Sequence, residues 1–403
     1  DNAEGRVFVS QLTGFNSLTA HTSDDGATYS PSTGGGIPSG ADHQSIGAGP
    51  YPAGSLIPRL TSYPNAVYYC SQSVAAAFCA RSDDGGTTFG AGVPLYTIGT
   101  CGGLHGHVRV GPDGTVYVPN KNCGTTQAVF VSKDAGLTWT MRPVPGSTPH
   151  TAILDPSMGI ASDNTGYFGF VGESDGQPKI AVTRDHGQTW TTPIDVGAPL
   201  GIENATFPEV IAGDGDRAAF AWLGTTTDGR PQLERFGKNG PEYDGGDYYL
   251  YISSTFDRGA TWTTVNATPG DPVQRGRICH GGGGCTMGHR NLLDFNDIQV
   301  DKQGRVLVGW ADGCTLDCVD SIAVSDNKLT AKGTITRQVG GTLLFRSGVI
   351  PTVSGPAKAK PPPSRPTGKG GGLPATGGSV SLALLGVLLI GGVALARRQR
   401  TSR

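Results

Sequence analysis

Polar side chains recur at one equivalent position of three segments that read as β-strands. The three are His107, Glu209 and Asp297, flanked by His105, Arg109 and Asp294. Two carboxyl groups about 5 to 10 Å apart can cleave a glycosidic bond, with one of them acting as general acid. Glu209 and Asp297 are therefore candidate catalytic residues, and a glycoside hydrolase is one function that the sequence predicts.

Cationic and aromatic residues near these segments could bind a substrate. A guanidinium group can hold a carboxylate by two parallel hydrogen bonds, so an anionic substrate would lie against the arginines. The candidate substrate-binding residues are Arg59, His107, Arg109, Arg290, Trp222 and Trp310. The two tryptophans end strands and could form a floor on which a sugar ring stacks. The other interpretation is that these polar groups pair with one another and with water.

The elements that carry the candidate residues are strand–turn–strand units. Each unit alternates apolar and polar residues on both sides of a turn rich in Gly and Asp, which is the signature of a β-hairpin. The units occupy residues 108–118, 160–168, 210–220 and 298–308. Because Glu209 and Asp297 come directly before two of these units, we expect the first strands of a repeated β fold to position both carboxylates.

A second element is a short turn that occurs five times with the same sequence pattern, [ST]-x-D-x-G-x-T-aromatic. The copies cover residues 22–29, 82–89, 132–139, 183–190 and 255–262. The Asp carboxylate can accept from backbone N–H groups of the turn, and the Gly supplies a backbone angle that other residues resist. The aromatic ring can pin the turn onto neighbouring strands. The turn aspartates, expected to be structural, are Asp24, Asp84, Asp134, Asp185 and Asp257.

This turn resembles the Asp box, or bacterial neuraminidase repeat, of sialidases and other β-propellers. The resemblance implies an all-β, sialidase-like propeller in residues 1–350, with six blades of four antiparallel strands each. Five blades carry a copy of the turn, and the segment from Asp294 to about Gly340 is the sixth, with a degenerate copy at 325–327. Residues 225–246 read as an insertion. The innermost strand of the first blade is expected before residue 1 or from the stretch near Leu343.

The resemblance to sialidases does not extend to their catalytic residues. That family has an Arg-Ile-Pro element, three arginines on the substrate carboxylate and a Tyr–Glu nucleophile pair. Here the nearest string is Ile57-Pro58-Arg59, in the wrong order, and no Tyr–Glu pair can be placed. Two functions therefore stay open. One is a non-catalytic propeller that binds an extracellular glycan or protein, and the other is an exo-acting glycoside hydrolase of the sialidase type.

Composition and charge disfavour other classes of protein. The 64 glycines among 403 residues are about twice the usual share, which argues against a mainly helical chain. Residues 351–403 contain eight basic residues and no acidic one, so residues 1–350 carry 23 basic and 33 acidic residues. Such an acidic body is not expected to bind nucleic acid, which needs a basic surface.

Eight cysteines fall in four close pairs. Neighbours in sequence are the simplest partners, although the sequence allows many other connectivities. The predicted disulfides are Cys70–Cys79, Cys101–Cys123, Cys279–Cys285 and Cys314–Cys318. Because no C-x-x-C pair is present, a zinc site is disfavoured, and we predict neither a metal nor another cofactor. Disulfides indicate an oxidising, extracellular setting.

The C-terminal segment has a distinct composition. Residues 351–372 are rich in Pro, Gly and Lys and read as a disordered linker. Residues 380–396 form an apolar run without charge, just long enough to cross a bilayer core as one transmembrane helix. The basic tail 397–403 marks the cytoplasmic side. An ordinary tail anchor or a buried helix would also explain the apolar run.

The order of short motif, apolar run and basic tail resembles the LPxTG cell-wall sorting signal of Gram-positive surface proteins. The motif is Leu373-Pro374-Ala375-Thr376-Gly377, so the signal covers residues 373–403. The resemblance implies that a sortase cleaves between Thr376 and Gly377 and joins the threonine to peptidoglycan. It predicts an exported protein, anchored to the cell wall of a Gram-positive bacterium. Because the chain starts without Met or signal peptide, we expect a mature form or a fragment.

Overall fold

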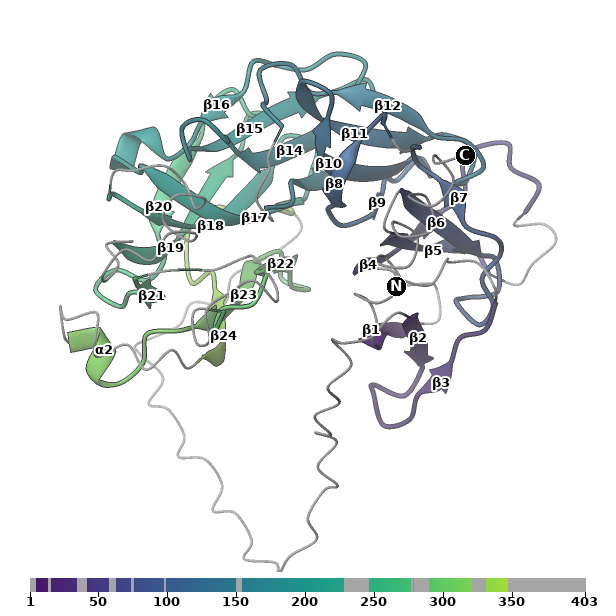
Figure 1. Cartoon of the computed structure of the whole chain (residues 1–403), viewed down its shortest axis with the longest axis horizontal. Coiled ribbons are helices and arrows are strands. Elements are labelled where there is room, and N and C mark those ends of the chain that lie inside the picture. Colours follow the sequence, from purple (N-terminus) through teal and green to yellow (C-terminus); the bar gives the residue numbers. More distant parts are fainter. Residues whose placement is uncertain are drawn as a thin grey trace, which may run out of the picture. The chain divides into compact units, whose positions relative to one another are not determined.

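The structure is a computed structural model that describes residues 5–346 except for 14–15, 35–41, 58–62, 74–75, 98, 150–153, 228–245, 277, 279–289 and 321–330. Within these residues helix is scarce, chiefly α2 (Asp317–Asp320) and the 3-10 turn η2 (Ala198–Leu200). The strands form six antiparallel sheets that follow one another in chain order around a centre (Figure 1). Residues 5–346 therefore form an all-β, six-bladed β-propeller, as the sequence predicted.

Each blade is one sheet. Blade 1 contains β1 (Val7–Thr13), β2 (Asn16–Thr22) and β3 (Ser30–Pro31). Blade 2 contains β4 (Asp42–Pro50), β5 (Asn65–Gln72), β6 (Ala77–Ser82) and β7 (Val93–Pro94). Blade 3 contains β8 (Gly102–His105), β9 (Arg109–Val110), β10 (Val116–Cys123), β11 (Thr126–Ser132) and β12 (Thr140–Pro143).

The second half of the ring follows the same plan. Blade 4 contains β13 (Ser157–Ile160), β14 (Gly166–Val171), β15 (Pro178–Thr183) and β16 (Ile194–Asp195). Blade 5 contains β17 (Asn204–Ala212), β18 (Ala218–Thr225), β19 (Asp247–Thr255), β20 (Thr263–Asn266) and β21 (Gln274–Arg275). Blade 6 contains β22 (Asp297–Val300), β23 (Val306–Asp312) and β24 (Lys332–Arg337).

The prediction of four strands in every blade is wrong, because among the described residues the sheets contain three to five strands. In blade 3 the inner strand is divided into β8 and β9 around Gly106. A Cβ atom at Gly106 would lie 2.1 Å from the carbonyl oxygen of Pro156, so only glycine allows blades 3 and 4 to approach this closely. In blade 5, the short strand β21 adds to the start of β19.

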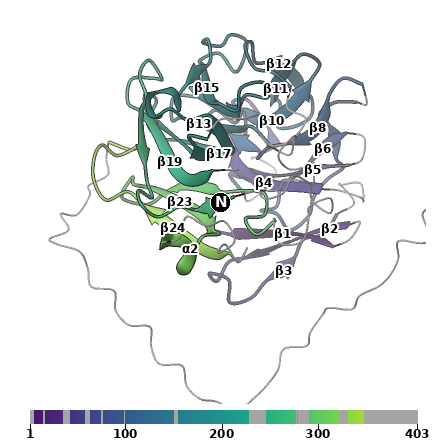
Figure 2. The ribbon, with the colours of Figure 1, turned by 60° about the vertical axis from the view of Figure 1, so that its left-hand side comes forward.

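Blade 1 has no described strand on the inner side of β1. Its strands match the second to fourth strands of blade 2, since β2 and β6 each end where a repeated turn begins. Gln299 of β22 lines a pocket with Val7 and Phe8 of β1, so blades 6 and 1 are neighbours (Figure 2). Leu344 forms backbone hydrogen bonds with Gly304 and Asp214, in turns of blades 6 and 5. The described part of the stretch near Leu343 therefore does not supply the missing strand.

Apolar side chains fill the spaces between the sheets. The largest cluster joins blades 4, 5 and 6 and includes fully buried Phe220, Trp222 and Leu250. Gly169 of β14 lets the sheets of blades 4 and 5 meet closely, because a Cβ atom there would lie 2.5 Å from Cγ2 of Val210. Close packing of this kind fixes the blades, and with them the side chains on the inner strands.

The five repeated turns share one hydrogen-bond pattern, and we number them 1 to 5 in chain order. In each turn the Asp carboxylate accepts from the hydroxyl of the first residue, and from the backbone N–H and hydroxyl of the Thr four positions later. Burial raises the pKa of the Asp134 carboxyl, but hydrogen bonds from Thr138 and Ser132 outweigh it and hold the pKa below its ordinary value. The aspartates therefore stabilise the turns from within.

Three of the four predicted disulfides are confirmed: Cys70–Cys79, Cys101–Cys123 and Cys314–Cys318. The fourth, Cys279–Cys285, lies outside the described residues, as do the linker, the 373–377 motif, the apolar run and the basic tail. No helix in the described part of the chain is long and apolar enough to cross a membrane.

Candidate functional site

Residues on or next to the inner strands of five blades, together with Lys121 of β10, meet in one group, which we call the axial cluster. It lies toward the strand ends opposite the repeated turns, where the chain enters each blade. Its members are His43, His105, His107, Arg109, Lys121, Asp155, Ser157, Glu209 and Phe295. Only the fold brings them together, because they come from blades 2 to 6.

Glu209 of β17 is the buried carboxylate on one side of the axial cluster. It is 5% exposed, and Oε2 accepts a hydrogen bond of 2.8 Å from the Ser157 hydroxyl of blade 4. Oε1 lies 3.4 Å from Nδ1 of His107, and Oε2 lies 3.8 Å from a guanidinium nitrogen of Arg109. The structure therefore brings together three predicted site residues, Glu209, His107 and Arg109, as mutual partners.

Asp155 is a second buried carboxylate, just before β13. Oδ2 lies 2.6 Å from Nδ1 of His43, and Oδ1 lies 3.7 Å from Nζ of Lys121, with all three side chains nearly inaccessible. Burial raises the pKa of Asp155, but the charges of His43 and Lys121 outweigh it, so the pKa stays below its ordinary value. A carboxylate whose pKa is lowered is ionised at neutral pH, and the charge of Asp155 is compensated by its two neighbours within the protein.

His105 lies beside this ion pair, with its ring centroid 6.5 Å from that of His43. Its Nδ1 donates a hydrogen bond of 2.8 Å to the carbonyl oxygen of Gly106, which leaves Nε2 unprotonated in the neutral ring. Burial lowers the pKa of His105 to about 4. The ring is therefore neutral at physiological pH.

The exposed part of the axial cluster is aromatic. Phe295, which precedes β22, is 42% exposed, and its ring lies 5.3 Å from the His43 ring and 5.5 Å from the His107 ring. Asp297 is also exposed and accepts a hydrogen bond from the backbone N–H of Ile298. An exposed aromatic ring beside polar groups offers a flat apolar surface on which a ligand could stack.

Irregular backbone in two inner strands, β4 and β17, sets the direction of nearby side chains of the axial cluster. The β4–β5 ladder shifts register between Asp42 and Ser45, and His43 has a left-handed φ of 54°. The β17–β18 ladder shifts between Thr206 and Glu209, and Phe207 has a φ of 53°. Bulges are typical of places where a strand redirects a side chain, and left-handed non-glycine residues cost about 1–3 kcal/mol each. Irregularity at the same level of two blades supports a functional role for the cluster.

Other predicted site residues lie elsewhere. Arg290 is engaged by Asp294 through two hydrogen bonds, of 2.6 and 2.5 Å, so its guanidinium already has a carboxylate partner. The predicted stacking floor is wrong, because Trp222 is 0% exposed and stacks on Tyr251, and Trp310 is 6% exposed. Both belong to the core between sheets. Arg59 lies outside the described residues.

Sequence reasoning missed the residues that complete the cluster: His43, Lys121, Asp155 and Phe295. None of these residues belongs to a repeated sequence motif. One signal was present, since a lysine inside the apolar strand β10 and an aspartate before β13 are both charges in segments that read as buried.

No protein-family model and no curated protein matches the chain. Among solved structures, a Hadza microbial sialidase is 14% identical, with a TM-score of 0.43, over 77% of this chain and 61% of its own. A GH74 enzyme of Niastella koreensis is 15% identical, with a TM-score of 0.42, over 76% of this chain and 43% of its own. A mutant Trypanosoma rangeli sialidase is 10% identical, with a TM-score of 0.40, over 80% and 49%. At these values no activity transfers to this chain.

Proposed function

We propose that this protein is a non-catalytic, cell-surface propeller whose axial cluster binds an extracellular ligand, a glycan or a protein. One observation carries the proposal: Glu209 and Arg290, two of the charged groups that a hydrolase would direct at a substrate, are already paired within the protein. Glu209 is held by Ser157, His107 and Arg109, and Arg290 is held by Asp294. What faces solvent is the Phe295 ring and Asp297, which favours a glycan stacked on Phe295.

The extracellular location belongs to the same proposal. The disulfides support an oxidising compartment. The sequence resemblance to a sorting signal supports export and attachment by a sortase to the peptidoglycan of a Gram-positive bacterium, with Thr376–Gly377 as the cleaved bond and a membrane-spanning stage beforehand.

A glycan array probed with the full chain tests the binding function, with Phe295→Ala as the variant expected to lose the signal. A parallel assay should follow release of sugar from fluorogenic glycosides, including sialosides. We expect no turnover. Turnover that Glu209→Gln abolishes would instead establish the exo-acting glycoside hydrolase, the second function left open by the sequence. Binding that is unchanged in Phe295→Ala would place the ligand elsewhere.

A further inference from the structure

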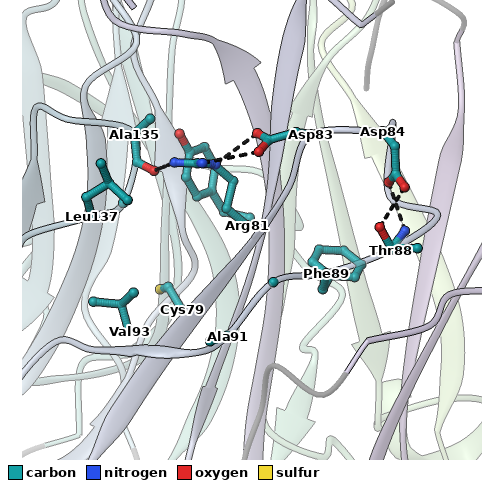
Figure 3. Close-up of a pocket in the computed structure, with 13 residues that line it drawn as sticks. Cys79, Arg81, Asp83, Asp84, Thr88, Phe89, Ala91, Val93, Ala135 and Leu137 are labelled. Carbon is teal, nitrogen blue, oxygen red and sulfur yellow. Dashed lines mark hydrogen bonds and ion pairs between the residues drawn. The ribbon is translucent and has the colours of Figure 1, made fainter. Parts of the chain in front are cut away.

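A pocket of about 550 Å³ lies between blades 2 and 3, on the face that carries the repeated turns. Phe89, Val93 and Leu137 contribute apolar walls, and Val93 and Leu137 face each other across the space above Cys79 (Figure 3). Arg81 bonds to both carboxylate oxygens of Asp83 and donates a hydrogen bond of 2.6 Å to the carbonyl oxygen of Ala135. The pocket therefore combines apolar walls with an ion pair whose charges cancel.

Tyr68 is one of the residues that line this pocket. Its side chain is fully buried, and its hydroxyl has no hydrogen-bond partner among the residues that the structure describes. A buried hydroxyl without a partner costs about 1–3 kcal/mol, so it calls for an explanation.

Two tyrosines at the same position of blades 3 and 4 do have partners. Tyr68, Tyr117 and Tyr167 are equivalent, because each pairs across the ladder with the residue directly before a repeated turn. The Tyr117 hydroxyl lies 2.6 Å from Nδ1 of His186, and the Tyr167 hydroxyl donates to the Gly215 carbonyl at 3.3 Å. Among these three equivalent tyrosines, Tyr68 therefore differs in having no hydrogen-bond partner for its hydroxyl among the described residues.

Two residues differ between the sites. Tyr68 pairs across the ladder with Arg81, where Tyr117 pairs with Val131, and the second difference is one residue of the next turn. The position between Asp and Gly is His186 in turn 4 and Ala135 in turn 3, with φ values of 61° and 58°. Because the backbone conformation is the same, both side chains leave the turn in the same direction. The His186 ring lies over the Tyr117 ring at 6.2 Å, and its Nε2 lies 3.6 Å from Asp113. Ala135 has no ring, and it lines the pocket.

We propose that this pocket binds a small imidazole-type ring, supplied by a ligand, in the way that the junction of blades 3 and 4 binds the ring of His186. The Tyr68 hydroxyl would bond to one ring nitrogen as Tyr117 does. Asp83, which already accepts from Arg81 and Tyr51, would lie near the other nitrogen, as Asp113 lies 3.6 Å from Nε2 of His186. Because Arg81 neutralises Asp83, the site favours a neutral ring over an anion. This site is on the opposite face from the axial cluster and does not depend on its function.

The probe is 4-methylimidazole at pH 8, where the ring is neutral, titrated into the full chain and followed by calorimetry and ligand-observed NMR. The unmodified protein should bind one equivalent. Ala135→His should abolish binding, since it supplies the ring from within the chain. Tyr68→Phe should weaken binding about fivefold, the effect of losing one hydrogen bond.

His186→Ala is the matched control, because it should open an equivalent space beside Tyr117 and raise the stoichiometry to two. Failure of the unmodified protein to bind overturns the proposal, whether or not His186→Ala binds. Binding that survives Ala135→His in a folded protein, as judged by circular dichroism, overturns it as well. If Ala135→His does not fold, Tyr68→Phe decides, and an unchanged affinity there contradicts the proposed contact.

Discussion

The repeated turns and the axial cluster both place carboxylates against hydrogen-bond donors. The donors are close in sequence in the turns and far apart in sequence in the axial cluster. Asp185 in turn 4 bonds to Thr183 and Thr189, within four residues of itself. Glu209 in the axial cluster bonds to Ser157, in another blade and 52 residues away. The turn can form from its own segment, whereas the cluster exists only once the ring of blades is complete.

This difference in range predicts different consequences of mutation. A turn is one of five similar local units, so removing its carboxylate should weaken one blade edge. The axial cluster is a network of buried charges shared by several blades, so removing one member leaves the others without compensation. Measured effects at independent sites usually add, whereas effects within one network do not.

The largest effect is expected for Asp155→Ala. It leaves Lys121 and His43 buried without their carboxylate, and breaking a buried pair in this way costs about 3–5 kcal/mol of unfolding free energy. Denaturant unfolding measures it. Asp175→Ala is the control, because its pair with Lys179 is partly exposed, with side chains 40% and 23% accessible, and should matter by less than about 1 kcal/mol. Equal effects of the two variants would refute a special role for the buried network.

Acid should lower the unfolding free energy of the protein by protonating His105. Its pKa is about 4 in the folded protein and 6.5 when unperturbed, so the unfolded chain takes up a proton that the folded chain refuses. This contribution to stability is intact above pH 6.5 and is lost as the pH falls to 4, by about 3 kcal/mol. The unfolding free energy of the protein and of His105→Gln should be measured between pH 4 and 6.5. If both fall by the same amount with pH, His105 is not the group responsible.

Smaller and local losses are expected at the turns. Asp134→Ala and Asp185→Ala should each lower the unfolding free energy by roughly 1 kcal/mol, because each turn loses hydrogen bonds that lie near solvent; the figure of about 1–3 kcal/mol would apply only to buried N–H groups. Neither should change ligand binding. The double variant should show the sum of the single effects, since the two turns lie in different blades. Lost binding without a change in melting temperature would show instead that the turns take part in recognition.

The smallest effect on stability is expected for Phe295→Ala. Its ring is 42% exposed, so the unfolding free energy should change by about 0.5 kcal/mol or less. Glycan binding should nevertheless fall at least about tenfold, the loss of one stacking platform. The same measurement on Leu200→Ala, which exposes a similar fraction of an apolar side chain away from the axial cluster, controls for general surface effects.

The sequence alone determined the parts of this protein whose interactions are local. Strand–turn–strand alternation and five copies of one turn predicted the all-β, six-bladed propeller, and short spacing predicted three disulfides that the structure contains. Each of these features depends on residues close together in the chain. Even there, strand numbers differ between blades, because contacts such as Gly106 against Pro156 reshape single sheets.

Only the tertiary structure decided how the inner-strand residues are used. Aligned positions predicted that Glu209 and His107 share a place in their strands, but not that they pair with each other or that Arg290 turns to Asp294. The buried ion pair of His43 and Asp155 left no repeated pattern, because its members come from different blades and meet only when the ring forms. Trp222 and Trp310, which the sequence suggested as ligand contacts, are likewise buried in the core. Partner choice and burial are properties of the packed ring, which is why no segment of the chain could reveal them.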